Sequence, residues 1–248
     1  MQISHLLVRG LTCIAIAFTL SACDQKTTSQ QAETQQALVA KNELVSLSGK
    51  TMGTTYHIKY SANNEVSITS KQVHEQIESI LKAVNAKMST YIQDSEISRF
   101  NQNTQTNTPI EISADFALVV KEAMRLNQVT QGALDVTVGP VVNLWGFGPE
   151  KRVEKQPTQA QINERQASVG IDKLSLTEEH GKFFLAKSVP QLYVDLSSIA
   201  KGFGVDQVAD YLESVHVQNY MVEIGGEIRA KGKNPENKAW QIAIEKPN

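Results

Sequence analysis

The chain has 248 residues and a formal net charge of −2 at pH 7, from 24 Lys and Arg against 26 Asp and Glu. This near-neutral balance, without a basic tract or an aromatic-interleaved Lys/Arg cluster, argues against a nucleic-acid-binding protein. The two cysteines, Cys13 and Cys23, both lie near the N-terminus, so the rest of the sequence has neither disulfide nor thiol chemistry.

The N-terminal segment has the layout of a secretory leader. His5 and Arg9 form a basic flank, residues 11–20 are apolar, and Leu20-Ser21-Ala22-Cys23 reads as a lipobox. The apolar run has about ten residues, roughly half of what a membrane-spanning helix needs. We therefore expect a lipoprotein signal peptide over residues 1–22.

Cleavage there would make Cys23 the lipid-carrying first residue of the mature chain. An ordinary signal peptide with an incidental cysteine is the alternative. Asp24 resembles the signal that retains bacterial lipoproteins at the inner membrane, which predicts a lipid-anchored protein on the periplasmic side.

The lipidated Cys23 and the Gln, Thr, Ser and Ala-rich residues up to 43 have the composition of a flexible tether. Folded structure is expected from near Leu44. We interpret 44–248 as one large domain, or two intimately packed subdomains.

The first elements of this domain have clear periodicity. Tyr56, Ile58 and Tyr60 alternate with polar residues, which predicts a half-buried strand. A helix is then expected behind a Thr69/Gln72 capping box, and it should cover one face of a sheet. Its apolar residues fall at helical spacing: Val73, Ile77, Ile80, Leu81, Val84 and Met88.

Further elements follow. Ser113 can cap a helix that runs through Val129 and is closed by Gly132, and a third helix is expected around 208–215. Strands are predicted at 220–224 and 240–244. Strands and helices do not alternate regularly, so the fold class is α+β rather than doubly wound.

A glycine-, proline- and aromatic-rich segment at 132–149 is the first stretch with chemical rather than architectural character. Its glycines let the backbone approach a ligand closely, and flat side chains can wall a planar ring. The structural alternative is a helix C-cap, a strand and a turn-rich loop.

The second stretch is 194–204, where a strand is expected to end at Asp195 and two serines can cap a helix. Free backbone N–H groups there favour an anion such as phosphate, and Lys201 adds positive charge. A simple N-cap is the alternative, and the segment is not a Walker A loop.

The third stretch, 223–227, carries Gly225 and Gly226 between two glutamates that could meet a ribose or adenine edge. A plain β-turn is equally compatible. The five histidines show no metal spacing, which argues against zinc, and no Gly-x-Ser-x-Gly elbow of a serine hydrolase is present.

Taken in order, these stretches resemble the ApbE-like FAD:protein FMN transferases. The resemblance covers most of the chain and rests on segments 51–56, 88–101, 134–140, 144–149, 194–202 and 223–227. It implies an α+β fold, T-fold-related, with mixed sheets and packed helices.

The resemblance also implies site residues. FAD would be held by Met52, Tyr91, Ala133, Leu134, Asp135, Asp195 and Lys201. Met52 and Tyr91 can pack on rings, the two aspartates can accept hydrogen bonds from ribose or adenine, and Lys201 can offset phosphate charge. In the family a Mg²⁺ ion bridges the pyrophosphate, and one of its ligands falls at Ser198.

The implied reaction moves FMN from FAD to a threonine or serine hydroxyl of a target protein and releases AMP. The expected targets are flavin-carrying subunits of membrane redox complexes. The alternatives are a lipoprotein that binds FAD or hydrolyses it to FMN and AMP, and a non-enzymatic lipoprotein that scaffolds a membrane complex.

One departure from the family pattern concerns the C-terminus. Family members continue well beyond Asn248, with a His-containing motif and the Asp and Thr positions that complete the magnesium shell. We therefore expect the sequence to be C-terminally truncated and inactive alone, and we assign no catalytic base.

Overall fold

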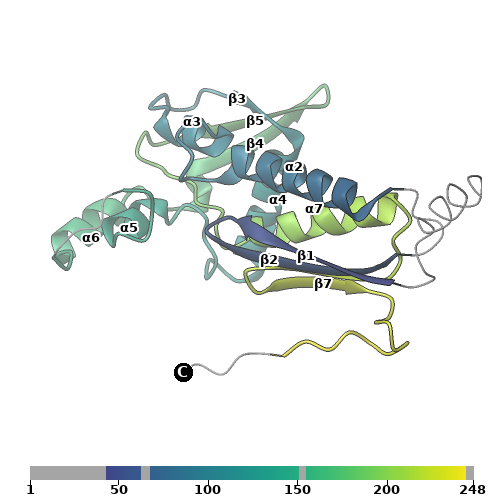
Figure 1. The fold of residues 1–248 in the computed structure, drawn as a ribbon. Coiled ribbons are helices and arrows are strands. Elements are labelled where there is room, and N and C mark those ends of the chain that lie inside the picture. Colours follow the sequence, from purple (N-terminus) through teal and green to yellow (C-terminus); the bar gives the residue numbers. More distant parts are fainter. Residues whose placement is uncertain (1–42, 63–67, 151–154, 244–248) are drawn as a thin grey trace, which may run out of the picture. The chain divides into compact units, whose positions relative to one another are not determined.

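The computed structural model describes residues 43–62, 68–150 and 155–243. The chain divides into two units, Met1–Leu38 and Val39–Asn248, and every described residue lies in the second. The predicted signal peptide and Cys23 therefore lie outside the described residues. Figure 1 shows helices and sheets interspersed along this unit, which confirms the α+β class. In the described strands both sheets are antiparallel rather than mixed.

A four-stranded sheet contains the predicted strand around Ile58. Its order is β1 (Glu43–Thr51), β2 (Thr54–Ala62), β6 (Tyr220–Ile224) and β7 (Glu227–Lys231). The alternation predicted in β2 is confirmed, because Tyr56, Ile58 and Tyr60 are all buried. The predicted strand at 220–224 is confirmed as β6.

Two tight turns close the hairpins of this sheet. Met52 and Gly53 join β1 to β2 with φ values of 50° and 74°, and Gly225 and Gly226 join β6 to β7 with 55° and 98°. Positive φ at both central residues is the signature of a type I′ turn, whose twist matches that of the strands. The Gly225 amide donates to the Thr55 carbonyl (3.1 Å), so the two turns lie side by side.

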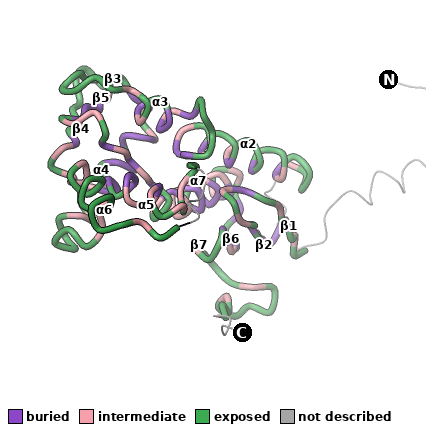
Figure 2. The backbone as a smooth tube through the Cα atoms, turned by 90° about the vertical axis from the view of Figure 1, so that its left-hand side faces the viewer, coloured by how far each residue is buried: buried purple, intermediate pink, exposed green. Residues whose placement is uncertain are grey.

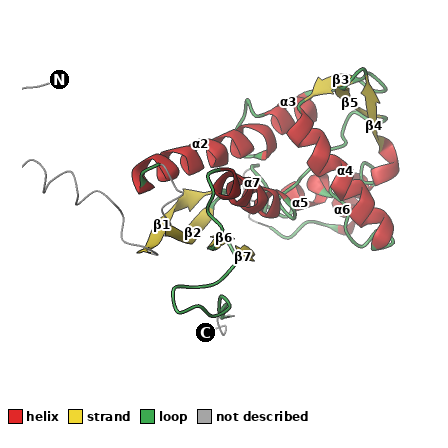
Figure 3. Cartoon of the chain, turned by 90° about the vertical axis from the view of Figure 1, so that its right-hand side faces the viewer, coloured by secondary structure: helices red, strands yellow, loops and turns green. Residues whose placement is uncertain are grey.

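Helices α2 (Ser70–Met88) and α7 (Ala200–Ser214) cover one face of this sheet, as Figures 1 and 3 show. The Thr69/Gln72 capping box of α2 is present as predicted. The helices and the sheet share one core, which holds the buried residues Tyr56, Ile58, Tyr60, Val73, Ile77, Leu81, Val205, Val208, Leu212, Tyr220, Val222 and Ile224.

Ion pairs fix α7 against the edge strand β7. Arg229 of β7 lies 3.0, 2.9 and 3.0 Å from carboxylates of Asp206, Asp210 and Glu213, which follow one another along α7. Hydrogen bonds from Lys231 and then Tyr220 lower the pKa of Glu213 to about 2. This network holds β7 alongside the middle and the end of α7.

A second core lies around a three-stranded sheet of order β3 (Ile110–Ile112), β5 (Lys182–Lys187), β4 (Leu174–Glu179). Helices α3 (Glu96–Gln102) and α4 (Ala114–Val129) pack there. The prediction for α4 is confirmed at both ends, with Ser113 as its cap and Gly132 at φ 85° just beyond it. Figure 2 shows the buried residues of the two cores.

The glycine- and aromatic-rich segment forms turns and a short helix, α5 (Gly139–Leu144), instead of a strand. Pro140 sits in the first turn of α5, where its missing N–H costs nothing. Helix α6 (Gln159–Gln166) and a 3₁₀ turn at Ile171–Lys173 lead to β4. No helix among the described residues is long and apolar enough to cross a membrane.

Two of the predicted strand positions are wrong. Residues 240–243 form no strand; instead, the Trp240 indole donates to the Lys231 carbonyl (2.9 Å), just past the end of β7. No strand ends at Asp195 either, since residues 194–196 are irregular. The strand that follows β6 is β7 at 227–231, because the paired glycines reverse the chain immediately.

Lys187, at the end of β5, is 2% exposed. Its ammonium group donates to the carbonyls of Asn101 and Leu192 (both 3.0 Å) and lies 5.4 Å from the centre of the Phe100 ring. Burial lowers the pKa of Lys187 from 10.5 to about 8.

This shift predicts a pH-dependent stability. Between the two pKa values, about 8 and 10.5, the unfolded chain binds the extra proton, so the charge penalty is present below that window and disappears as pH rises through it. The free energy of unfolding should rise across this window by about 3 kcal/mol relative to Lys187→Met, on the scale of 1.36 kcal/mol per pKa unit. Urea denaturation at a series of pH values measures the free energy of unfolding of both proteins. The same pH dependence in wild type and Lys187→Met would contradict the prediction.

Candidate functional site

A cavity of about 650 Å³ opens where the two cores meet. Four segments line it: the β1–β2 turn, the end of α2 with the loop after it, the loop after α5, and the start of α7. Its size is in the range of small-molecule sites. The lining residues are Met52, Gly53, Val84, Asn85, Met88, Ser89, Thr90, Tyr91, Ile92, Phe147, Ser197, Ala200 and Lys201.

Met52 forms the wall on the sheet side and packs against both cores. A methionine at φ 50° is unusual, since a side chain in this region costs about 1–2 kcal/mol. Gly204 of α7 leaves room for it, because a Cβ there would lie 2.9 Å from the Met52 methyl carbon. The strained turn thus holds a flexible thioether at the cavity.

Two aromatic rings form the rim. Tyr91 is 66% exposed and Phe147 is 72% exposed. The Tyr91 hydroxyl donates to the Phe147 carbonyl (2.8 Å), which ties the loop after α2 to the loop after α5. Large exposed apolar groups at a cavity mouth mark a surface that binds something.

Lys201 provides the positive charge of the site. It lies in the first turn of α7, and its ammonium group is 3.0 Å from a carboxylate oxygen of Glu227, the first residue of β7. The other carboxylate oxygen of Glu227 is buried without a partner among the described residues. The N-cap residue Ile199 makes no side-chain capping bond. The Ala200 amide donates to the Leu196 carbonyl (2.8 Å), so the Lys201 and Gly202 amides are the first-turn N–H groups that could meet an anion.

Asp195 lies immediately beside the cavity without lining it. One of its carboxylate oxygens accepts from the Ser197 amide (2.9 Å) and from the Ser197 hydroxyl (2.5 Å). The prediction that the two serines cap α7 is therefore wrong. Ser197 is engaged in a turn with Asp195, and the helix begins only after Ile199.

Ala133, Leu134 and Asp135 also lie outside the lining. Their loop joins Asp195 through the bond from the Asp195 amide to the Val136 carbonyl (2.8 Å). The Asp135 carboxylate accepts from the amide (2.8 Å) and hydroxyl (2.6 Å) of Thr137. The structure thus places Met52, Tyr91 and Lys201 around the cavity and the other four predicted FAD residues in an adjoining layer.

Ser198, the predicted metal ligand, is exposed and is not part of the lining. Within residues 43–62, 68–150 and 155–243, no group of three or more His, Cys, Asp or Glu residues could hold a metal ion. One serine hydroxyl does not make the oxygen shell that Mg²⁺ requires. The described residues therefore do not fit a magnesium site by themselves.

Several lining residues were not predicted from the sequence, and Asn85 is the clearest of them. Its amide donates to the Thr51 hydroxyl (3.0 Å) and to the Leu81 carbonyl (2.8 Å), linking α2 to the β1–β2 turn. An asparagine between the buried Val84 and Met88 of α2 was the available signal. The Lys201–Glu227 pair was also missed, because only the hairpin brings these residues together.

The sequence matches the model of the ApbE family over residues 52–248. The chain belongs to the ApbE family. Among curated relatives, it is 65% identical over 241 residues to the FAD:protein FMN transferase of Haemophilus influenzae, covering 97% of this chain and 65% of that protein. It is 36% identical over 234 residues to the FAD:protein FMN transferase of Escherichia coli, covering 94% of this chain and 64% of that one.

Solved ApbE structures share the fold. The flavin transferase ApbE from Vibrio cholerae superposes with a TM-score of 0.77 at 56% identity, covering 83% of this chain and 65% of that one. The apo form of the Pseudomonas stutzeri flavinyl transferase ApbE gives 0.76 at 34% identity, covering 83% and 67%. The chain thus spans about 60–65% of the length of the first curated relatives it matches.

Proposed function

We propose that the protein is a flavin transferase that moves FMN from FAD to a threonine or serine hydroxyl of a target protein. The observation that carries the proposal is the cavity that combines Met52, Tyr91 and Lys201 at the start of α7. The names of the relatives support it, since they are FAD:protein FMN transferases.

The cavity suits FAD chemically. Met52, Tyr91 and Phe147 offer soft and aromatic surfaces for the flavin ring. Lys201 and the first-turn amides of α7 suit the pyrophosphate. Asp195 and Asp135, in the adjoining layer, carry carboxylates that can accept hydrogen bonds from ribose or adenine hydrogens.

In the proposed step the acceptor oxygen forms a bond to the FMN phosphorus of FAD. The bond from that phosphorus to the oxygen bridging to AMP breaks, AMP leaves with the electron pair, and the hydroxyl proton is released. Phosphoryl transfer depends mainly on positioning and charge neutralisation. Lys201 would hold the pyrophosphate and offset the charge that develops on it.

Magnesium remains part of the proposal, with Ser198 as the described residue that would supply one oxygen ligand. When bound, a hard cation would neutralise further negative charge of the FAD phosphates. The described residues supply no more than this hydroxyl, and the proposed step depends on Lys201 and the acceptor hydroxyl.

The acceptor and the location complete the proposal. We place the protein on the periplasmic face of the inner membrane, anchored through lipidated Cys23, with flavin-carrying subunits of membrane redox complexes as acceptors. A lipid anchor would confine enzyme and acceptor to one surface, which raises their effective concentration.

The transferase activity is tested with the intact protein, FAD, Mg²⁺ and a threonine-bearing acceptor domain. The acceptor should become fluorescent on a denaturing gel, and mass spectrometry should show a covalent FMN adduct with AMP released. An acceptor whose threonine is replaced by alanine is the control. Free FMN and AMP without an adduct would show FAD hydrolysis instead.

Tyr91→Ala and Asp195→Ala should each weaken FAD binding by about 1–3 kcal/mol, the scale of losing a packed aromatic or a buried hydrogen-bond partner. Titration of flavin fluorescence measures both. Tyr211→Ala is the control for loss of a tyrosine. Tyr211 packs against the core of the four-stranded sheet and is not part of the cavity lining. Unchanged affinity in both site variants would remove these residues from the site.

Cys23→Ala should abolish lipidation, because the thiol is the proposed attachment point. Labelling of cells with a palmitate analogue, with and without globomycin, measures this, and Cys13→Ala is the matched control. Label retained by the Cys23 variant would show an ordinary leader or another anchor.

A further inference from the structure

Asn101, the sixth residue of α3, forms two hydrogen bonds with the backbone of the loop that carries Asp195. Its side-chain amide donates to the Val194 carbonyl (2.8 Å), and its side-chain oxygen accepts from the Val194 amide (2.8 Å). One side chain therefore satisfies both backbone groups of the residue before Asp195. This bidentate contact fixes the position and orientation of that peptide as a strand partner would, although no strand is present.

Lys187, the last residue of β5, holds the same loop through a second set of bonds. Its ammonium group donates to the Leu192 carbonyl and to the backbone carbonyl of Asn101, both at 3.0 Å. A single buried group thus joins β5, α3 and the loop. We call Asn101 and Lys187 the loop clamp.

The clamped loop connects directly to the proposed FAD residues. The next amide, that of Asp195, donates to the Val136 carbonyl (2.8 Å), which brings the loop beside Asp135. The Asp195 carboxylate then holds Ser197, which lines the cavity. A shift at Val194 would therefore move both aspartates relative to the cavity.

Burying the Lys187 ammonium group opposes folding. A buried ammonium without a carboxylate partner carries a desolvation penalty, and an apolar side chain of similar length would avoid it. A cation–π contact with the Phe100 ring, whose centre is 5.4 Å from the ammonium group, offsets part of this desolvation penalty. The ammonium group donates two hydrogen bonds to carbonyls on separate segments. A methionine at this position could make neither bond.

We propose that Asn101 and Lys187 are positioning residues for the nucleotide end of the FAD site. They hold the 192–195 loop, whose Asp195 amide donates to the Val136 carbonyl, and so fix Asp195 relative to the loop that carries Asp135. This inference rests on the proposed function and adds to it two residues that lie outside the cavity lining.

The test compares Lys187→Met and Asn101→Ala with wild type in the intact protein. The control is Lys182→Met, the same change on the same strand, where Lys182 is exposed and pairs with Glu111 at 3.0 Å. Three quantities are measured: hydrogen exchange of the Val194 and Asp195 amides, the FAD dissociation constant, and the flavin absorbance difference spectrum at saturating FAD.

In both clamp variants we expect amide exchange at 194–195 to become at least tenfold faster and the FAD dissociation constant to rise about tenfold. The difference spectrum at saturation should stay that of wild type, because Met52 and Tyr91 are undisturbed. Exchange in β2 and β6 should not change, and Lys182→Met should resemble wild type throughout.

Faster exchange with unchanged FAD affinity would overturn the positioning role, and unchanged exchange would overturn the clamp itself. A spectrum altered at saturation, together with faster exchange in β2 and β6, would show a purely structural role and also overturn it. If wild type binds no FAD, the proposed function fails, while the exchange data still decide whether the clamp holds the loop.

Discussion

Lys201→Met is expected to slow FMN transfer by about 100- to 1000-fold, the usual cost of removing one electrostatic stabiliser of a transition state. Methionine keeps the length of the side chain but leaves the pyrophosphate charge opposite the α7 N-terminus without its cation. It also leaves Glu227, which pairs with Lys201 at 3.0 Å, as an uncompensated negative group beside the cavity. Single-turnover in-gel fluorescence of the acceptor measures the rate.

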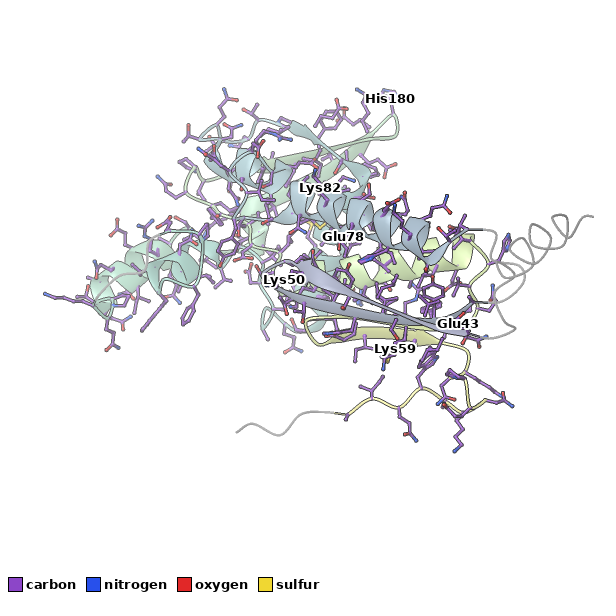
Figure 4. All side chains as sticks on the ribbon, viewed as in Figure 1. Glu43, Lys50, Lys59, Glu78, Lys82 and His180 are labelled. Atoms are coloured by element: carbon purple, nitrogen blue, oxygen red, sulfur yellow. The ribbon has the colours of Figure 1, made fainter. Side chains whose placement is uncertain are left out.

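Lys82→Met is the matched control for this variant. Lys82 lies on α2 (Figure 4), is exposed and is not part of the cavity lining. Its transfer rate should equal that of wild type. A Lys201→Met protein that transfers FMN at the wild-type rate would remove Lys201 from the phosphate site and leave the cavity without its proposed cation.

Gly225→Ala is expected to weaken FAD binding at least tenfold, beyond any loss of fold stability. At φ 55° an alanine is strained by about 1–2 kcal/mol. Its Cβ would also lie 2.7 Å from Thr54 Cγ2 and 3.2 Å from Lys201 Cδ. Thr54 must then shift, and the Lys201 stem must give by a few tenths of an ångström, so we expect the ammonium group to move from its position at the cavity.

Gly226→Ala separates these two causes. Gly226 also has a positive φ, of 98°, but a Cβ there meets nothing within 4 Å. This variant should lose stability while keeping its FAD affinity. Thermal unfolding and flavin titration on both variants give the comparison, and equal losses of affinity would show that backbone strain alone is responsible.

Local signals in the sequence predicted the elements whose causes are local. Thr69 and Gln72 cap α2, and Ser113 caps α4, because each capping bond joins residues three apart. The alternation around Ile58 predicted β2 because a strand between a core and solvent has a period of two. The short strands β3, β4 and β5 were not predicted, since non-local pairing decides such segments.

The prediction that serines cap α7 was wrong because two hydrogen-bonding arrangements compete for Ser197. Asp195 and Ser197 can close a turn, or Ser197 can cap a helix, and both use short polar side chains next to free amides. The Asn101–Val194 contact, formed by residues 93 positions apart, fixes the loop in the first arrangement. Nothing within the segment itself reveals this.

The site was predicted by resemblance more than by pattern. Met52 in a tight turn, Tyr91 in a loop and Lys201 in a helix share no spacing, and only the fold brings them to one cavity. Phe147 was included in an aromatic segment expected to wall a ring, and the structure does place it at the rim. Glu227 lay in the glycine-rich stretch, but its pairing with Lys201 depends on how β7 meets α7.

The two-residue turn at Met52 and Gly53 also constrains how this protein can change in evolution. Thr51 pairs with Thr54, and the whole of β1 is registered from that pair as far as Glu43 with Ala62. Lengthening the turn by one residue would either unpair the hairpin or slide β1 by one position, which exchanges its two faces. Val45 and Leu47, which pack against the core, would then face solvent. Insertions that reshape the cavity should therefore be found in the loop after α5, and the β1–β2 turn should keep its length wherever the sheet is kept.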